Sequence, residues 1–309
     1  MTKTLIAVVG PTAVGKTALG IQLAQRFAGE VVSGDAMQVY KRMDIGTAKV
    51  RFEEMHGVPH HLIDVLEPSE SWTVASFQEK ARAVIDDIRE RGKRPILVGG
   101  TGLYVQAITH ALDFNEASSD PDFRARMEAY AKAHGEAALH ACLAEQDMAA
   151  AQRIHPNNSR RVIRALEVIH VTGKPYSAQE QAPATERVIM IGLTMARERL
   201  YERINKRVDE MMTAGLLEEV RQLHEEGIRG QSIQAIGYKE LYQYLDGEVS
   251  LAEAVAQLKQ NSRRYAKRQL TWFRNRSEAV WFHMDEDEPA RVFEKIFAFI
   301  EGKLSYEHE

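Results

Sequence analysis

The segment Gly10–Thr17, with the sequence GPTAVGKT, constrains the fold of this chain more than any other feature. Its spacing of two glycines followed by lysine and threonine matches the phosphate-binding loop. The apolar run Leu5–Val9 precedes it and a helical pattern follows it. Strand, loop and helix in this order begin a parallel α/β sheet. The alternative, an ordinary glycine turn, is disfavoured by the full match to the motif.

The loop predicts a site for a chain of phosphates, whether or not they belong to a nucleotide. Glycines let the backbone curl so that several N–H groups point inward, and the following helix adds its positive N-terminal end. Lys16 can reach the terminal phosphate oxygens, and the Thr17 hydroxyl is placed to bind Mg²⁺. The predicted substrate-binding residues are Gly10, Pro11, Thr12, Ala13, Val14, Gly15, Lys16 and Thr17.

Composition excludes several classes of protein. The 309 residues carry a net charge of −4, so no overall positive field indicates nucleic acid. Cys142 is the only cysteine, which excludes an internal disulfide and a cysteine zinc site. No apolar stretch is long enough to cross a bilayer, and the phosphate loop at residue 10 leaves no room for a signal peptide. We expect a cytoplasmic protein.

Periodicity predicts an α/β protein in which a P-loop parallel sheet is flanked by helices and carries an all-helical insertion domain. Strands are expected over 5–9, 30–33, 61–65, 95–98 and 187–194, and helices over 17–27 and 74–91. Residues 120–172 show helical periodicity and no good strand. The predicted boundaries are 1–112 for the first part of the core, 113–186 for the insertion and 187–309 for the rest of the core.

Two strand ends carry candidate chemical groups. Asp35 follows the second strand, where the carboxyl ends of strands meet ligands, and its carboxylate can hold Mg²⁺ or accept a proton. The alternative for Asp35 is a helix N-cap. Gln38 can read a base edge with its amide, although alone it would be a surface residue. Gly99–Gly102 allows close approach of a ligand to Thr101, or is simply a tight turn.

A basic helix is expected in the C-terminal part. Seven basic residues and no acidic one lie between 259 and 276, and Leu258, Tyr265 and Trp272 recur on the opposite half. Such a face suits a polyanion, the alternative being a solvated charged helix. Arg153, Arg160, Arg161 and Arg164 form a smaller basic cluster in the predicted insertion.

The group His56, His60, His61 and Asp64 invites a metal site, but Gly57 and Pro59 interrupt any helix that would align these ligands. Core or hydrogen-bonding histidines are favoured instead. No strand ends in the aspartate typical of many P-loop ATPases, and the Asn-Lys-x-Asp motif of GTPases is absent.

Eight segments in order across the chain resemble the bacterial tRNA dimethylallyltransferases, also called tRNA isopentenyltransferases. They are Gly10–Thr17, Ser33–Tyr40, Met43–Lys49, His60–Asp64, Val98–Tyr104, Arg161–Glu167, Gln234–Glu240 and Lys267–Arg274. The family segment often reads Ser-Ala-Asp-Ser where this chain has Gly34 and Ala36 around Asp35, so a hydroxyl contact at position 36 is lost.

The resemblance implies transfer of a dimethylallyl group from its diphosphate to the exocyclic amine of the adenosine 3′ of the anticodon. The loop would hold the diphosphate with Mg²⁺, Asp35 would take the amine proton, and Thr101 and Gln38 would position the flipped adenosine. The insertion would grip the anticodon stem-loop of tRNA, and the protein would be a monomer. The implied catalytic residues are Asp35, Lys16, Thr17 and Thr101. The implied tRNA contacts are Asp35, Ala36, Met37, Gln38, Thr101, Arg124, Arg160, Arg161, Arg164, Lys267, Arg268 and Arg274. The implied metal ligand is Thr17, together with Asp35 in one arrangement.

Two other functions stay open from the sequence. A P-loop small-molecule kinase would use the same loop with Asp35 activating a hydroxyl, but it leaves the basic helix and the insertion unexplained. A non-catalytic, nucleotide-dependent RNA-binding protein would need the basic faces but not Asp35.

Overall fold

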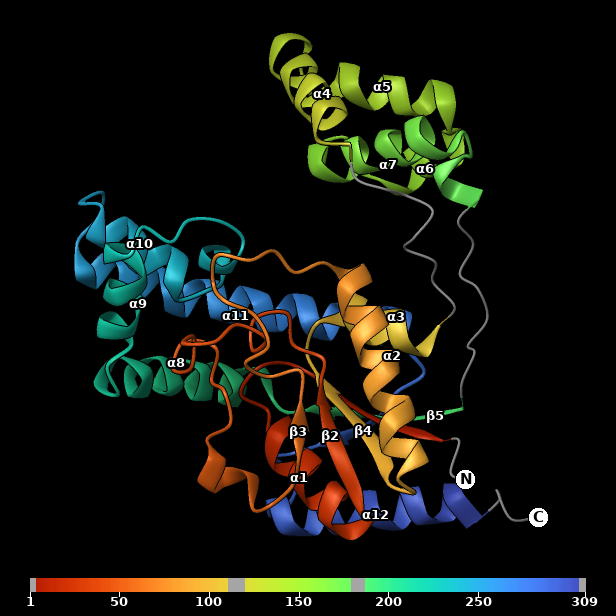
Figure 1. Ribbon diagram of the computed structural model, residues 1–309, viewed down its shortest axis with the longest axis vertical. Coiled ribbons are helices and arrows are strands. Elements are labelled where there is room, and N and C mark those ends of the chain that lie inside the picture. Colours follow the sequence, from red (N-terminus) through yellow and green to blue (C-terminus); the bar gives the residue numbers. More distant parts are fainter. Residues whose placement is uncertain (1–3, 111–119, 179–186, 306–309) are drawn as a thin grey trace. The chain divides into compact units, whose positions relative to one another are not determined.

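The computed structural model describes residues 4–110, 120–178 and 187–305 (Figure 1). The chain divides into two compact units, one formed by residues 1–109 and 185–309 and the other by residues 110–184. Each unit has a hydrophobic core of its own. The predicted boundaries at 112/113 and 186/187 fall on or beside stretches outside the described residues, so they stay predictions.

The larger unit is built on a parallel sheet of six strands in the order β3-β2-β4-β1-β5-β6, which confirms the predicted α/β class. The strands are β1 (Leu5–Val9), β2 (Gly29–Ser33), β3 (His60–His61), β4 (Arg94–Gly99), β5 (Val188–Thr194) and β6 (Val280–His283). The strand expected over 61–65 is wrong in length, because Leu62 and Asp64 have positive φ angles and end β3 after two residues. The sequence did not predict β6.

Side chains of β1 alternate between the two faces of the sheet. Ile6 and Val8 pack into the core beneath α1 (Lys16–Arg26) and α12 (Pro289–Ser305). Leu5, Ala7 and Val9 belong to the other core, which α2 (Val74–Glu90) and α3 (Gly102–Thr109) cover. Figure 1 shows α1 and α12 on one side of the strands and α2 on the other. Because β1 is covered on both faces, all five of its residues are buried, and it reads as a continuous apolar run.

Helices α8 to α11 complete the larger unit beside the carboxyl ends of the strands. They are α8 (Arg197–Thr213), α9 (Leu216–Glu225), α10 (Tyr238–Leu245) and α11 (Leu251–Arg276). Helix α11 packs on α8 and α10, and α9 packs on α10. A reciprocal cap between Ser250 and Glu253 starts α11, eight residues before the basic run. Short 3₁₀ turns lie at η1 (Phe52–Met55), η2 (Tyr176–Ala178) and η3 (Ser232–Gln234), η2 belonging to the smaller unit.

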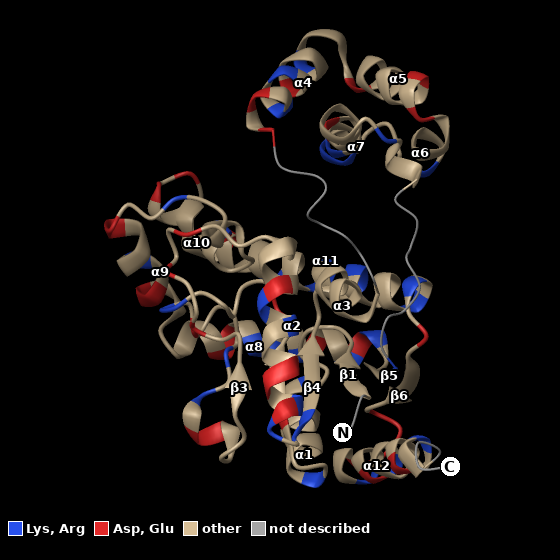
Figure 2. Ribbon diagram, turned by 45° about the vertical axis from the view of Figure 1, so that its right-hand side comes forward, with Lys and Arg blue, Asp and Glu red and all other residues tan. Residues whose placement is uncertain are grey.

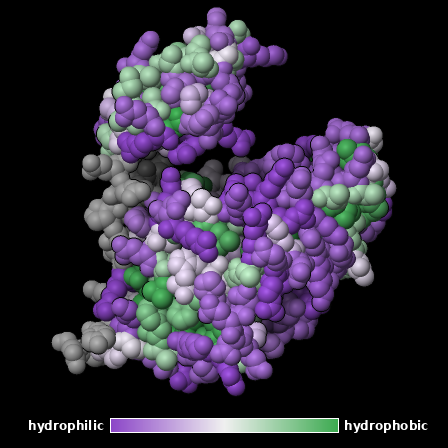
Figure 3. Space-filling model, turned by 180° about the vertical axis from the view of Figure 1, so that it is seen from behind, coloured by the Kyte–Doolittle hydropathy of each residue, from purple (hydrophilic) through white to green (hydrophobic). Residues whose placement is uncertain are grey.

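Within residues 120–172 the smaller unit consists of helices and short connections without a strand, as the periodicity predicted. Its helices are α4 (Pro121–His134), α5 (Glu136–Gln146), α6 (Met148–Arg153) and α7 (Ser159–Thr172). Side chains of Asp120, Asp147 and Asn158 cap three of them by accepting backbone N–H groups. On the face drawn in Figure 3, the surface of each unit is largely hydrophilic. In the described part of the chain, no helix has the length and apolar character to cross a membrane.

Candidate active site

The phosphate loop connects β1 to α1, and two of its glycines are required by geometry. Gly10 has a φ of +145°, and a Cβ there would lie 2.5 Å from the backbone oxygen of Leu193. Gly15, at the start of α1, has a φ of +113°. Only glycine adopts such angles readily. The loop therefore curls in the way that the motif predicted.

Lys16 lies at the base of the loop, where its Nζ donates to the backbone oxygen of Pro11 at 2.7 Å. Burial lowers the pKa of this ammonium to about 8, Asp35 opposes that fall, and the positive charge of Arg207 adds to it. The three charged groups are therefore close enough to interact. At neutral pH Lys16 remains mostly protonated, so it can exchange the Pro11 oxygen for an anionic ligand.

A cavity of about 340 Å³ opens beside the loop, which is a size typical of ligand pockets. Thr12 of the loop, Asp35, Thr101 and Arg207 supply polar groups, and Arg207 also donates to Thr12 at 3.4 Å. Ala36, Met37 and Arg268 lie in its wall, as do apolar residues of α8 and of the 234–237 segment. The cavity thus brings together Asp35 and Thr101, which follow two different strands and are 66 positions apart in sequence.

Asp35 is not the helix N-cap that the sequence offered as an alternative. Its Oδ1 accepts the backbone N–H groups of Met37 at 2.8 Å and Gln38 at 3.4 Å, which fixes a turn rather than capping a helix. No hydrogen bond within the described residues is recorded for its other oxygen, Oδ2. One oxygen of this carboxylate therefore accepts backbone N–H groups, which leaves the other oxygen to contact a ligand in the cavity.

Tyr265 of α11 lies close to Thr101 and Gln269. Burial raises the pKa of its phenol to about 12, and these two neighbouring side chains act in the opposite direction. Gln269 in turn accepts the backbone N–H of Thr12 at 2.9 Å and donates to the backbone oxygen of Gly100 at 3.0 Å. Helix α11 therefore contacts both the phosphate loop and the Gly99–Gly102 turn.

Gln38 is directed elsewhere. Its Oε1 accepts from the Ser33 hydroxyl at 3.2 Å, and its Nε2 donates to the backbone oxygens of Thr47 and Ala48 at 3.3 and 3.5 Å. It lines a separate small cavity together with Thr17 and His60. In this structure the Gln38 amide serves the protein's own backbone, and its contact with a base stays a prediction.

Thr17 is exposed at the first turn of α1, and its hydroxyl is the kind of hard oxygen ligand that Mg²⁺ binds. Asp35, the second predicted ligand, lines the larger cavity, whereas Thr17 lines the smaller one. The chemistry of the two groups fits Mg²⁺, and their joint use as ligands stays a prediction.

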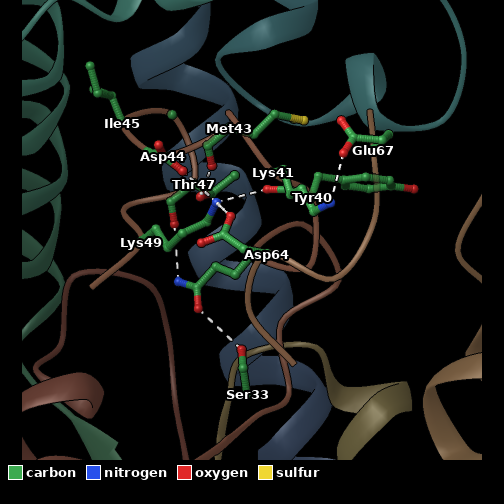
Figure 4. Close-up of polar contacts among 12 residues, drawn as sticks. Ser33, Tyr40, Lys41, Met43, Asp44, Ile45, Thr47, Lys49, Asp64 and Glu67 are labelled. Atoms are coloured by element: carbon green, nitrogen blue, oxygen red, sulfur yellow. Dashed lines mark hydrogen bonds and ion pairs between the residues drawn. The ribbon is translucent and has the colours of Figure 1, made fainter. Parts of the chain in front are cut away.

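Residues 46–48 line the cavity, and the 44–49 segment that contains them is fixed from two sides. The carboxylate of Glu219 accepts the backbone N–H groups of residues 44, 45 and 46 at 2.8 to 3.1 Å, and it also accepts the Tyr238 hydroxyl. Figure 4 shows the Lys49 ammonium between two carboxylates. It lies 2.5 Å from Asp44 and 2.5 Å from Asp64, and its side chain is only 5% exposed.

Much of the basic run of α11 faces solvent. Lys267, Arg268 and Arg274 are exposed, and Figure 2 shows basic residues along this helix. Two members of the run are engaged with α8, because Lys259 pairs with Asp209 and Arg263 donates to Asn205. Of the predicted apolar stripe, Leu258 is buried, whereas Tyr265 and Trp272 are half-buried.

The arginines predicted to contact tRNA from the smaller unit fall into two groups. Arg160 and Arg161 are exposed on α7. Arg124 and Arg164 instead pair with the fully buried carboxylate of Glu167, at 2.8 and 2.5 Å. The second pair therefore has a structural role that the sequence did not indicate.

Two histidines of the predicted group, His60 and His61, have hydrogen-bond partners. His61 Nε2 lies 2.7 Å from Glu30, and His60 Nδ1 lies 2.9 Å from the backbone oxygen of Val58. Burial lowers the pKa of His60. Both rings thus have partners in the larger unit, in keeping with hydrogen-bonding histidines.

Three site residues escaped the sequence reasoning: Arg207, Tyr265 and Gln269. Arg207 lies in a helix with four other basic residues between 197 and 207, and nothing in the local sequence distinguishes it from them. Tyr265 was assigned to an apolar stripe, and Gln269 lies inside a basic run. A polar residue at a buried position of an amphipathic helix is the signal that could have identified Gln269.

Comparison with known proteins gives a consistent result. The sequence model of the family described as IPP transferase matches residues 38–276. The chain is 64% identical over 302 residues to the tRNA dimethylallyltransferase of Shouchella clausii and 54% identical over 305 residues to that of Bacillus subtilis, with 97% of each chain covered. It is also similar to the crystal structure of the full-length tRNA isopentenylpyrophosphate transferase from Bacillus halodurans, with 53% identity, a TM-score of 0.77 and both chains fully covered. A eukaryotic dimethylallyltransferase described as acting on tRNA aligns with 31% identity and a TM-score of 0.81, over 97% of this chain and 80% of that one. The match covers more than half of the chain and the relatives cover nearly all of it, so this protein belongs to the IPP transferase family.

Proposed function

We propose that this protein transfers a dimethylallyl group from dimethylallyl diphosphate to the exocyclic amine of the adenosine 3′ of the anticodon in tRNA. The observation that carries the proposal is the cavity in which Asp35 and Thr101 meet the phosphate loop and Arg207. Relatives that cover 97% of the chain bear the name tRNA dimethylallyltransferase. The P-loop kinase alternative is not favoured by these matches.

On the donor side, the allylic C–O bond breaks and its electron pair leaves with the diphosphate. Negative charge therefore grows on the leaving group, and groups already aimed at it lower the barrier. Lys16, the loop amides and Arg207 are such groups, and we expect Arg207 to contact the diphosphate. Mg²⁺, held by Thr17 and the diphosphate, would add a further positive charge.

On the acceptor side, the amine nitrogen forms the new bond to the allylic carbon and must lose a proton. Asp35 is oriented to accept that proton because Met37 and Gln38 fix one of its oxygens. Thr101 and Tyr265 line the same cavity, where their hydroxyls can contact the acceptor. The adenosine must leave its stack to enter, as bases do in other enclosed sites.

Basic residues would hold the RNA. Exposed Lys267, Arg268 and Arg274 on α11 and exposed Arg160 and Arg161 on α7 can neutralise phosphates of the anticodon stem-loop. The insertion domain, as predicted over 113–186, would supply the second set. A tRNA substrate is consistent with a cytoplasmic location, and the monomeric state stays a prediction.

The proposal is tested by incubating the protein with Mg²⁺, unmodified tRNA and dimethylallyl diphosphate labelled in the allyl group. Transfer of label to RNA, with release of diphosphate, is expected. Label that stays in the diphosphate while the RNA still binds would refute the enzymatic assignment. Transfer of label from γ-labelled ATP to a small acceptor would support the kinase alternative instead.

A further inference from the structure

Gln269 is a buried polar side chain at the centre of the site, and the proposed mechanism does not use it. It lies on α11 with a relative exposure of 5%. Its carbonyl accepts from Thr12 in the phosphate loop, and its amide donates to Gly100 in the turn that carries Thr101. Tyr265 of the same helix lies close to it. A single amide therefore bonds to both substrate-bearing loops.

These contacts differ from ordinary helix packing. Thr12 and Gly100 lie in loops after β1 and β4, and Gln269 reaches them from a helix that lies 257 and 169 residues further along the chain. An added Cβ at Gly100 would overlap the Gln269 amide nitrogen, so position 100 leaves room for the contact only as glycine. Buried amides have few alternative partners, so the two loops cannot separate without leaving polar groups unpaired.

We propose that Gln269 is a positioning residue that fixes the phosphate loop against the Gly99–Gly102 turn, so that the allyl donor and the amine acceptor are held at reacting distance. The inference rests on the proposed function, because it assigns the two loops to donor and acceptor. Gln269 is not among the residues that line the cavity, so it acts through Thr12 and Gly100 rather than by touching substrate. Misplacing two reactants by about 1 Å can cost on the order of 10²-fold in rate.

A double-mutant cycle between Gln269→Ala and Gly100→Ala tests the coupling. The φ angle of Gly100 lies outside the left-handed region, so its alanine variant acts mainly by displacing the Gln269 amide. Each single variant is expected to lower kcat, Gln269→Ala by about 10²-fold, with the KM for tRNA changed by less than about threefold. The double variant should be no slower than Gln269→Ala, because the contact is already lost. Losses that multiply in the double variant, or an unchanged kcat in Gln269→Ala, would overturn the inference.

Matched controls separate positioning from folding. Gln260→Ala removes an exposed glutamine from the same helix, and Gly302→Ala adds a Cβ where nothing lies within 4 Å, so both should keep the wild-type kcat. All rates are measured well below the Tm of each variant. If Gln269→Ala does not fold, Gln269→Glu replaces it: its carboxylate still accepts from Thr12 but cannot donate to Gly100, so the loss of kcat should persist.

Binding of inorganic diphosphate gives a readout that does not depend on the reaction. Gln269→Ala releases the phosphate loop, and we expect its diphosphate affinity to fall by about tenfold relative to wild type, because a preorganised loop binds more tightly. Wild-type protein that binds diphosphate but transfers no allyl group would count against the proposed function alone. Active wild-type protein with unchanged diphosphate affinity in Gln269→Ala would count against the role of Gln269 alone.

Discussion

Acid should destabilise the larger unit through one buried carboxylate, that of Glu30 on β2. Glu30 is 5% exposed and is bound by Arg91 through both carboxylate oxygens and by His61 at 2.7 Å. The hydrogen bonds from Arg91 lower its pKa from 4.5 to about 2, although burial acts in the opposite direction. Because His61 belongs to β3, this network ties the edge of the sheet to β2 and to the end of α2.

The size of the effect follows from the pKa. The folded pKa lies about 2.5 below the unfolded one, and at 1.36 kcal/mol for each pH unit the ionised form stabilises the fold by about 3 kcal/mol at neutral pH. The folded pKa is depressed, so the contribution is present above pH 4.5 and is lost as the pH falls towards 2. About half of it should remain at pH 3.

Glu30→Gln removes the charge while keeping the shape. The free energy of unfolding of this variant should be about 3 kcal/mol below wild type at pH 7, and the difference should shrink to about 1.5 kcal/mol at pH 3. Tryptophan fluorescence during urea unfolding measures the larger unit alone, because all three tryptophans lie there: Trp72, Trp272 and Trp281. The exposed Glu79→Gln on α2 is the control and should stay within about 0.5 kcal/mol of wild type.

Two results would refute this reasoning. Glu30→Gln could be as stable as wild type at pH 7, which would mean that desolvation cancels the ion pair. Alternatively, the difference between the two proteins could be the same at pH 7 and pH 3, which would mean that the folded pKa of Glu30 is not depressed.

Three further predictions concern the site and the RNA-binding surfaces. Asp35→Asn keeps an acceptor for the Met37 N–H but removes the base. Its kcat, measured with labelled donor, should fall by about 10²- to 10⁴-fold, while its KM stays within about threefold of wild type. A near wild-type rate would exclude the base role. Lys16 loses its proton as the pH rises through its pKa of about 8, so the diphosphate affinity of the wild type, measured by calorimetry, should fall by up to about tenfold between pH 7 and 9. Lys16→Arg is the control, because its guanidinium stays charged and its affinity should change less. Parallel pH profiles of the two proteins would contradict this prediction. Arg160→Ala should reduce the slope of the salt dependence of tRNA binding by about one charge without changing thermal stability. Arg124→Ala should instead lower the unfolding free energy of the smaller unit by about 3 kcal/mol, as measured by circular dichroism during unfolding. The reverse pattern would show that the roles of the two arginines are exchanged.

The parts of the fold that local sequence determines were predictable. The apolar runs at β1, β4 and β5 are buried on both faces, so their composition alone identifies strands. The two edge strands were not predicted correctly, for different reasons. At β3 the chain turns to positive φ at Leu62, which a residue with ordinary β propensity does not reveal. At β6 only four residues pair, and none of them is fully buried.

The site residues likewise divide into those that local sequence predicts and those that depend on tertiary packing. Lys16, Asp35 and Thr101 follow strand ends, and parallel strands bring their carboxyl ends to one edge, so sequence order implied their proximity. Arg207 and Gln269 reach that edge from helices α8 and α11, and their positions depend on tertiary packing. Charge periodicity separates the exposed face of a helix from its buried face, but it does not say which loop a side chain on that helix will contact.

Packing also explains why a generic phosphate loop can serve allyl transfer. The large cavity has polar groups near the loop, from Thr12 and Arg207, whereas Met211 and Leu258 supply apolar surface in the same cavity. A substrate with a charged end and a hydrocarbon end fits this division, because each end is matched and no buried polar group loses a partner. An acceptor rich in hydroxyl groups, as many kinase substrates are, would leave hydroxyls against apolar walls. On the proposed function, the helices that follow β5 would therefore select the allyl donor, and the loop would hold its diphosphate leaving group.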